Sequence, residues 1–168
     1  MSVAGDQTAP DGPLTGVTIR RATRTDLQAV IALLADDPLG ATREQAGAGS
    51  AGPDPAYVAA FDAIASDPNQ FLAVAECENT VIATLQLTYI HGLSRGGARR
   101  GQIEAVRVAR AWRGRGLGRH MIEWAVATCR REGCTLVQLT SDRSRERAHD
   151  FYTRLGFTAS HLGFKRTI

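Results

Sequence analysis

The sequence predicts a single α/β (α+β) domain over residues 17–168, in which helices flank a mixed β-sheet. Three observations lead to this prediction. A length of 168 residues suits one hydrophobic core. Hydrophobic residues make up 43% of the chain and charged residues 22%, which excludes wholesale disorder and a collagen-like chain. A strand hairpin in the middle of the chain is followed by a β-α-β-α series.

The N-terminal part is expected to hold a tail, one strand and one helix. Residues 1–16 are mostly small and polar without periodicity, so we expect a disordered tail outside the domain. A short strand is predicted at 17–20, and Thr25 is expected to cap a helix that stops before Pro38. The apolar residues of that helix recur at helical spacing: Leu27, Val30, Ile31 and Leu34.

A second helix and a hairpin should follow. The Gly- and Ala-rich segment 36–53 is expected to be irregular, of the kind that borders binding sites. The helix is predicted over 54–68, with inward-facing Tyr57, Phe61 and Ile64. The strands 71–76 and 81–90 flank the polar turn 77–80 and predict an antiparallel pair. The second strand alternates, and its polar face carries Thr84, Gln86 and Thr88.

The second half of the chain predicts alternating strands and helices that two short strands complete. Gly133 and Gly156 are expected to end the two helices. In order, the predicted elements are the strand 102–108, the helix 117–131, the strand 135–140, the helix 145–155 and the strands 157–160 and 164–167. This order is typical of an α/β or α+β domain around a mixed sheet.

Composition restricts the class of protein. The longest apolar runs fall far short of the roughly 20 residues of a membrane-spanning helix. The N-terminus lacks the basic flank and apolar stretch of a secretory signal, so we expect a cytoplasmic protein without membrane contact. The cysteines form no CxxC pair, so buried free thiols are expected rather than a disulfide framework or a metal site: Cys77, Cys129 and Cys134. A net charge of +3 implies no particular partner.

The most informative stretch is the loop 113–119, which joins a strand to a helix. It contains three glycines and three arginines: Gly114, Gly116, Gly118, Arg113, Arg115 and Arg119. Glycines let backbone amides approach an anion closely, the helix start favours negative charge, and arginines add charge-assisted donors. The pattern predicts a phosphate site, and the alternative is a glycine turn with solvated arginines.

Two known phosphate motifs do not fit this loop. A P-loop needs a lysine and a serine or threonine after its glycines, and no lysine follows here. A dinucleotide-binding loop needs a third glycine where Arg119 or Met121 stands. We therefore expect neither a nucleoside triphosphate nor a dinucleotide.

Two segments of the second half carry a recognisable pattern. Residues 113–118 read Arg-Gly-Arg-Gly-Leu-Gly, and residues 148–157 place a Phe-Tyr pair and a Leu-Gly-Phe triplet on one helix. Together with the order of elements, they resemble the GNAT superfamily of acyl-CoA-dependent N-acetyltransferases, whose signatures are Q/R-x-x-G-x-G/A and A-x-x-F-Y-x-x-L-G-F. The resemblance implies a mostly antiparallel sheet, acetyl-CoA as cosubstrate, and strands 102–108 and 135–140 that splay apart at the cofactor.

The resemblance also implies which residues bind the cofactor. Backbone groups of Val106 and Val108 would hold the pantetheine arm, and the amides of 114–119 would hold the pyrophosphate. The full expected set is Val106, Arg107, Val108, Arg113, Gly114, Arg115, Gly116, Leu117, Gly118, Arg119 and Tyr152. Arg145 stands where the family often has an asparagine, so an amide contact common in the family lacks its side chain here.

Two residues are candidates for the chemistry. Glu104 is the only acid between Arg95 and Arg119, and its place on the strand before the loop makes it a candidate general base. The alternative for Glu104 is a structural ion pair, for example with Arg107. Tyr152 lies on an apolar helix stripe, which alone predicts a core aromatic. The resemblance implies instead that Tyr152 protonates or hydrogen-bonds the coenzyme sulfur.

The leading function is acetyl transfer from acetyl-CoA directly to a primary amine of a small molecule, with peptide or protein amines as the alternative acceptor. The arginines of loop 93–100 favour an amino acid or metabolite that also carries an anionic group: Arg95, Arg99 and Arg100. A second hypothesis is a sensor that binds acyl-CoA without turnover. Nucleic-acid binding is not expected, since Trp112 is the only aromatic among the arginines. The resemblance allows a homodimer.

Overall fold

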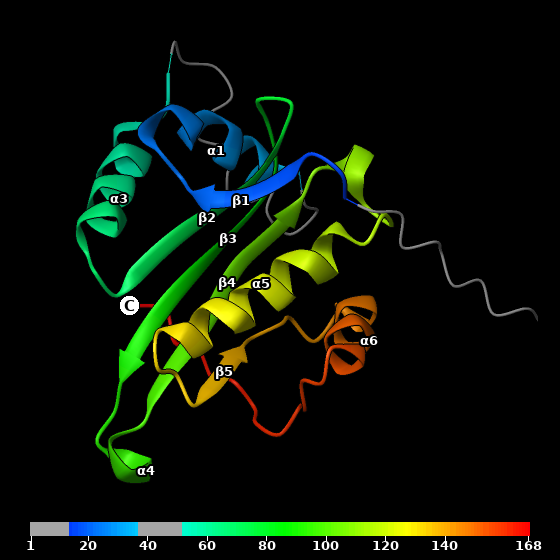
Figure 1. Ribbon diagram of the computed structural model, residues 1–168. Helices are drawn as coiled ribbons and strands as arrows, with labels where there is room; N and C mark the ends of the chain where they lie inside the picture. The colour runs from blue at the N-terminus through cyan, green and yellow to red at the C-terminus, as the bar shows by residue number, and fades with distance from the viewer. Residues whose placement is uncertain (1–13, 37–51) are drawn as a thin grey trace, which may run out of the picture.

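The computed structural model describes residues 14–36 and 52–168, which form a five-stranded sheet with helices on both faces (Figure 1). The strands lie side by side in chain order: β1 (Val17–Arg21), β2 (Gln70–Cys77), β3 (Thr80–His91), β4 (Arg99–Val108) and β5 (Leu136–Leu139). The first four pair antiparallel, and β5 runs parallel to β4. The predicted mixed, mostly antiparallel sheet is confirmed.

The predicted helices are confirmed close to their expected ends. They are α1 (Leu27–Ala35), preceded by the 3₁₀ turn η1 (Arg24–Asp26), α3 (Pro55–Ser66), α5 (Leu117–Arg131) and α6 (Glu146–Arg154). The short α4 (Ser94–Gly97) and the 3₁₀ turn η3 (Arg110–Trp112) lie in stretches expected to be loops. Gly133 and Gly156 have φ angles of 74° and 84°, the left-handed conformation that ends a helix.

The cap before α1 differs from the prediction. Asp26 is the N-cap of α1, and Thr23 rather than Thr25 is the N-cap of the preceding 3₁₀ turn η1. The Thr23 backbone N–H donates to Asp26 Oδ2 at 2.7 Å. Arg20 Nη2 donates to the other oxygen, Asp26 Oδ1, at 2.9 Å, and Arg20 also pairs with Glu76 on β2. Hydrogen bonds from Arg20, and secondly from Thr23, lower the pKa of the buried Asp26 carboxyl to about 2. This network joins β1, β2 and the start of α1.

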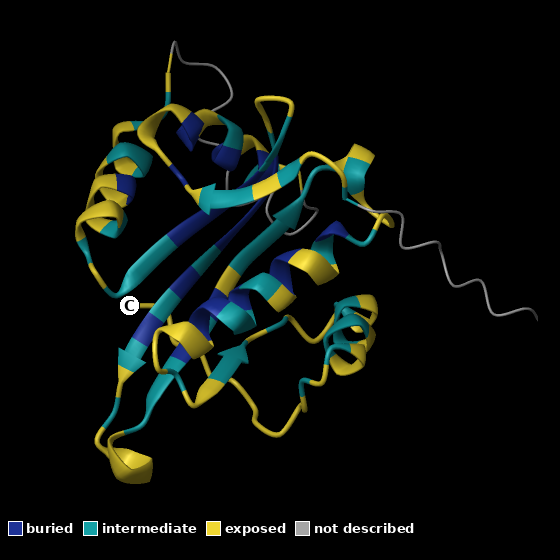
Figure 2. Cartoon of the chain, in the orientation of Figure 1, coloured by how far each residue is buried: buried dark blue, intermediate teal, exposed yellow. Residues whose placement is uncertain are grey.

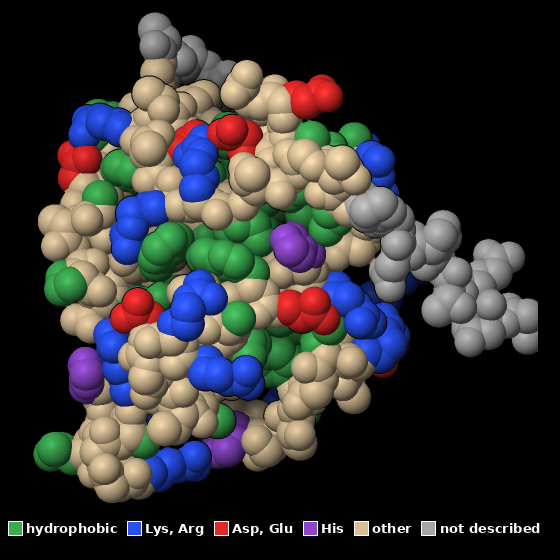
Figure 3. All heavy atoms as spheres, viewed as in Figure 1, with side chains coloured by type: hydrophobic (Ala, Val, Ile, Leu, Met, Phe, Trp, Pro, Cys, Tyr) green, Lys and Arg blue, Asp and Glu red, His purple; other side chains and the backbone are tan. Residues whose placement is uncertain are grey.

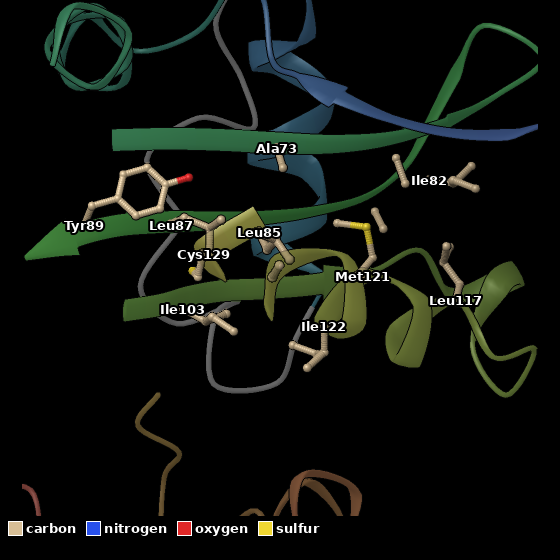
Figure 4. Close-up of a cluster of buried hydrophobic side chains, with 13 residues drawn as sticks. Ala73, Ile82, Leu85, Leu87, Tyr89, Ile103, Leu117, Met121, Ile122 and Cys129 are labelled. Carbon is tan, nitrogen blue, oxygen red and sulfur yellow. The ribbon is translucent and has the colours of Figure 1, made fainter. Parts of the chain in front are cut away.

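Apolar side chains form a core on each face of the sheet. Figure 2 shows the buried residues in dark blue along the central strands and on α1, α3 and α5. On one face α5 packs against β3 and β4, and the close-up shows these side chains pointing toward one another (Figure 4): Leu85, Leu87, Ile103, Leu117, Met121, Ile122 and Cys129. On the other face α3 packs against β2, and α1 packs against β3 and β4. This second cluster contains Val30, Ile31, Phe61, Leu72 and Val74. Tyr57 and Ile64 join this second cluster, which confirms the predicted inward face of α3.

The two C-terminal strands predicted at 157–160 and 164–167 are wrong. The described chain contains no strand after β5, and every residue from 158 to 168 is exposed. The alternation of apolar residues is typical of a strand, but a strand forms only where its backbone groups find a partner. Within residues 14–36 and 52–168 this segment has no strand partner.

Two other predicted segments include residues that the structure does not describe. Residues 1–13 of the predicted tail and residues 37–51 of the predicted irregular segment lie outside the described residues. Leu14 packs against the α5-side core, and the Val17 N–H donates to Leu14 O at 3.1 Å. Residues 14–16 therefore belong to the domain and not to the tail.

Candidate active site

β4 changes its surroundings halfway along its length. Up to Ile103 it pairs with β3 on one edge and with β5 on the other. The last β4–β5 pair joins Ile103 to Leu139, so residues 104–108 have no strand of the described chain on that second edge. The pairing of β4 with β5 therefore ends at Ile103, within the stretch 102–108 where the family resemblance predicted that the two strands splay apart.

A β-bulge marks this change. Thr84 and Gln86 of β3, two positions apart, pair with Arg107 and Glu104 of β4, which are three positions apart. The extra residue is accommodated around Ala105, whose φ of 53° lies in the left-handed region. Because Thr84 and Gln86 share one face of the sheet, Glu104 and Arg107 share that face as well.

Glu104 carries an exposed carboxylate on this half of the strand. Among the described residues, no hydrogen bond or ion pair reaches that carboxylate, so the structural pair with Arg107 is not formed. Arg107 Nη1 donates instead to the carbonyl of Val106 at 2.9 Å. A carboxylate without a cationic partner keeps its lone pairs available for a proton, as a general base requires.

The glycine-rich loop connects β4 and η3 to the start of α5. Gly114 and Gly116 have φ angles of 74° and 82°, which favour residues without a Cβ atom. Gly116 is the N-cap of α5, and its carbonyl accepts from the His120 N–H at 3.0 Å. The N–H groups of 117–119 precede this first helical bond, so they have no acceptor within the helix and point out at its positive end. The loop can therefore bind an anion.

The three arginines of the loop have different surroundings. Arg113 Nη2 donates to Asp36 Oδ2 at 2.9 Å, so this side chain fastens the loop to the end of α1. Arg115 is exposed and lies over the Trp112 ring, 4.5 Å from its centroid. Arg119 is also exposed on the first turn of α5. Figure 3 shows blue Lys and Arg side chains gathered on the side of the molecule where α5 begins.

Val106 and Val108 face the core with their side chains and have carbonyls bound by arginines. The carbonyl of Val106 accepts from Arg107, and that of Val108 accepts from Arg113 Nε at 2.9 Å. A carbonyl oxygen has two lone pairs, so a ligand amide could share either oxygen with its guanidinium.

Tyr152 lies half-buried on α6, close to the start of α5. Its ring stands edge-on to Phe151, with centroids 5.2 Å apart, and a Cβ atom on Gly118 would lie 3.5 Å from the Phe151 ring. Burial raises the pKa of Tyr152, against the opposing effect of the nearby Arg145 and Arg107 charges. The hydroxyl therefore stays protonated at neutral pH.

A row of polar side chains crosses the sheet beside Glu104, and the residue pattern alone did not identify it as part of the site. Gln86, which pairs with Glu104, donates from Nε2 to Gln70 Oε1 at 3.0 Å. Gln138 Nε2 donates to Gln102 Oε1 at 2.7 Å. The only signal in the sequence was the alternation of polar residues, which predicts solvent-facing positions equally well.

The arginines of loop 93–100 do not act as one group. Arg99 Nη1 donates to the carbonyl of Glu132 at 2.6 Å, and its guanidinium lies over the Tyr89 ring at 4.8 Å. Arg99 therefore fastens the β3–β4 hairpin to the end of α5. Arg100 lies on β4, two positions before Gln102 and on the same face.

Cysteines and charged clusters add no further site within residues 14–36 and 52–168. The three cysteines are free; Cys129 is buried, whereas Cys77 and Cys134 are half-buried. No three His, Cys, Asp or Glu side chains of the described chain lie together as metal ligands would. None of its helices combines the length and apolar character needed to cross a membrane.

Comparisons with known proteins agree on one family. The profile of the acetyltransferase (GNAT) family matches residues 29–157. Among solved structures, a transcriptional regulator from Bacillus halodurans C-125 is 41% identical with a TM-score of 0.86, over 90% of this chain and 99% of that one. A putative acetyltransferase from Agrobacterium tumefaciens str. C58 is 27% identical with a TM-score of 0.75, over 90% and 99% of the two chains.

A curated relative matches a shorter stretch. The aminoalkylphosphonate N-acetyltransferase of Salmonella typhimurium is 32% identical over 68 residues, which are 40% of this chain and 44% of that protein. The match thus spans less than half of the relative's length.

Proposed function

This chain belongs to the acetyltransferase (GNAT) family, and we propose that it transfers an acetyl group from acetyl-CoA directly to the primary amine of a small molecule. The observation that carries the proposal is the course of β4. Residues 104–108 of β4, one edge of which pairs with no strand of the described residues, lead through η3 into a loop whose amides begin a helix. The pantetheine arm of acetyl-CoA is extended and ends in a pyrophosphate. The arm is therefore complementary to the strand edge, and the pyrophosphate is complementary to the loop.

The chain offers suitable groups along the whole length of such a ligand. We assign the pyrophosphate to the backbone amides of 114–119, with Arg115 and Arg119 as exposed cations beside them. Backbone groups of Val106 and Val108 bind the amides of the pantetheine arm. Arg113 positions the loop through its contacts with α1 and β4.

Two side chains supply the proton transfers. Glu104 accepts a proton from the amine, directly or through a water, so that the nitrogen lone pair can form the new N–C bond to the thioester carbon. The C–S bond of the thioester breaks, and Tyr152 donates a proton to the departing sulfur. The exposed Glu104 carboxylate and the raised pKa of Tyr152 support these opposite roles.

The acceptor is an amine that also carries a carboxylate, phosphate or phosphonate. Arg107 shares the face of Glu104, and Arg100 lies on the same face at the other side of Gln102. A cation beside the general base favours a substrate with an anionic group. The local similarity to an aminoalkylphosphonate N-acetyltransferase supports the same class.

Calorimetric titration combined with a thiol-release assay tests the proposal. Acetyl-CoA should bind, and amines should be compared as matched pairs, such as 2-aminoethylphosphonate against ethylamine and an amino acid against its decarboxylated amine. We expect thiol release with the anionic member of at least one pair and little with its neutral partner. A protein that does not bind acetyl-CoA would contradict the whole assignment, whereas preference for the uncharged amines would contradict the acceptor class alone.

A sensor that binds acyl-CoA without turnover is the second candidate. It is favoured by the solved relative of 41% identity, which is described as a transcriptional regulator. The same assay separates the two functions, because a sensor would be stabilised by acetyl-CoA and would release no thiol with any amine, including peptides.

A further inference from the structure

Arg100 is a half-buried cation on the face of β4 that carries Glu104. Its Nε atom is buried and has no hydrogen-bond partner among the described residues. No ion pair within residues 14–36 and 52–168 involves its guanidinium. The residues that pair with Arg100 on the two adjacent strands are the apolar Ile90 and Leu136. Withdrawing a guanidinium from water without an acceptor costs free energy, so this position suits a ligand that brings an anion.

The other two arginines of β4 already have acceptors. Arg99 donates to the carbonyl of Glu132, and Arg107 Nη1 donates to the carbonyl of Val106. Arg107 also lies in the half of β4 that leads to the glycine-rich loop. Arg100 lies near the other end of the strand, which Figure 1 shows beside α4 and away from the start of α5. An anion bound at Arg100 would therefore be far from the proposed pyrophosphate site, where a second negative group would be repelled.

The spacing along β4 sets the length of such a ligand. Arg100 and Glu104 are four residues apart on one face of the strand, which separates their side chains by roughly 13 Å. A hydrogen bond of about 2.8 Å at each end leaves roughly 7 Å between the amine nitrogen and the anionic group. In an α-amino acid a single carbon separates these two groups, so such a molecule is too short to reach both side chains.

Amide side chains line the space between the two ends. Gln102 lies midway between Arg100 and Glu104, and its Oε1 atom accepts from Gln138 Nε2 at 2.7 Å. Gln102 Nε2 has only a 3.5 Å contact with the carbonyl of Ile103, and Gln138 Oε1 accepts no hydrogen bond from the described residues. A donor and an acceptor are thus available for a hydroxyl or an amide in the middle of the ligand.

We propose that Arg100 binds the anionic group of the acceptor, and that this acceptor joins its primary amine to a carboxylate, phosphate or phosphonate through a polar spacer of roughly 7 Å. The inference rests on the proposed function for the role of Glu104. It deepens that function, because it assigns the two ends of the acceptor to two side chains and disfavours molecules whose charged groups lie side by side. Arg100 binds the acceptor and transfers no proton, so its removal should raise KM and leave the chemical step in place.

Steady-state thiol release with paired amines tests the proposal. The natural protein should prefer 6-aminohexanoate to hexylamine, and glycylglycine to glycine, by at least about tenfold in kcat/KM. Arg100→Gln should lose both preferences through a higher KM for the longer anionic amine. Arg130→Gln is the matched control, since it removes an equal charge from an exposed position on α5, and it should keep both preferences. Arg100→Gln should also keep the melting temperature of the natural protein, because its guanidinium has no described partner to lose.

Calorimetry separates the failure of this inference from the failure of the proposed function. 6-Aminohexanoate is titrated into each protein in the presence of CoA, so that binding is measured without turnover. We expect the Kd to rise about tenfold in Arg100→Gln and to stay unchanged in Arg130→Gln.

Three results would overturn the role of Arg100: no binding of 6-aminohexanoate by the natural protein, equal binding by the natural protein and Arg100→Gln, or a preference for glycine over glycylglycine. A protein that releases thiol with no amine at all would contradict the proposed transfer. In that case the calorimetric comparison would still decide whether Arg100 binds the anionic group.

Discussion

The two halves of β4 have the same neighbour on one edge and differ on the other. Residues 99–103 lie between β3 and β5, with Gly101 and Ile103 buried. Gly101 packs so closely on α5 that a Cβ atom there would lie 2.3 Å from Cys129 Sγ. Residues 104–108 follow a bulge, have one strand neighbour within the described chain, and expose Glu104.

This difference separates framework from site within a single strand. In the first half, the backbone groups hydrogen-bond to two neighbouring strands and the side chains pack against other elements, so few groups are available to bind a ligand. The second half has a strand edge and the Glu104 carboxylate available for a ligand. Substitutions in the first half should therefore change stability, and substitutions in the second half should change activity.

The largest effect is expected for Glu104→Gln. Without a general base, kcat/KM should fall by about 10²- to 10³-fold, while the melting temperature stays unchanged because the carboxylate has no described partner. Glu78→Gln is the matched control, as Glu78 is an exposed carboxylate in the β2–β3 turn. Steady-state thiol release and thermal unfolding measure both properties. Equal activities for the two variants would remove Glu104 from the chemistry.

The next effect concerns the first half of β4. Gly101→Ala should lower the free energy of unfolding by about 2–3 kcal/mol, because its Cβ atom would collide with Cys129 Sγ. The double variant Gly101→Ala/Cys129→Ala removes that sulfur and should recover about 1 kcal/mol relative to the sum of the single changes. Urea unfolding of the four proteins gives the coupling. Strict additivity would show that Cys129 does not constrain Gly101.

High pH should lower the stability of the protein through Tyr89, which pairs with Gly101 in the first half of β4. Burial raises the pKa of Tyr89 to about 12, whereas in the unfolded chain it is near 10. The unfolded state loses this proton first, so the stabilisation is present below pH 10 and disappears as the pH rises toward 12. The loss amounts to about 2 kcal/mol at pH 12.

Tyr89→Phe isolates this contribution. Among the described residues the Tyr89 hydroxyl has no hydrogen-bond partner, so its removal should change stability little at pH 7. Urea unfolding at pH 7, 10 and 11 should show a weaker alkaline decline for Tyr89→Phe than for the natural protein. Parallel pH profiles would contradict the assigned origin of the decline.

The smallest effect is expected on the activity side. Tyr152→Phe should lower kcat about tenfold, equivalent to about 1.4 kcal/mol of barrier, because the departing sulfur then takes its proton from water. Tyr89→Phe makes the same chemical change on β3, opposite Gly101 in the first half of β4, and should leave kcat unaltered. If both variants keep full turnover, Tyr152 serves only as the core aromatic that its helix stripe predicts.

Local signals predicted a large part of this molecule. The spacing of apolar residues predicted the helix 117–131. The glycines before it predicted a tight loop, and Gly114 and Gly116 do adopt positive φ angles there. Two features depend on contacts distant in sequence and could not be predicted. The bulge at Ala105 exists only in the register with β3, and residues 164–167 have a strand pattern that pairs with no strand of the described residues.

The polar row beside Glu104 shows a further limit. Gln86 and Gln102 alternate with apolar residues, as solvent-facing positions of any sheet do. Only the pairing of β3 with β4 places Gln86 opposite Glu104. The residue types in the sequence were enough to identify Glu104 as the candidate base. Its neighbours could be identified only from the register of β3 with β4.

Hydrogen exchange of the backbone amides with and without acetyl-CoA tests the contrast between the two halves most directly. We predict slower exchange on binding in residues 104–108 and 114–119, and no change in residues 99–103, whose amides already lie between two strands. Exchange that stays the same in residues 104–119 when acetyl-CoA is bound, or protection confined to other parts of the chain, would contradict this account of the site.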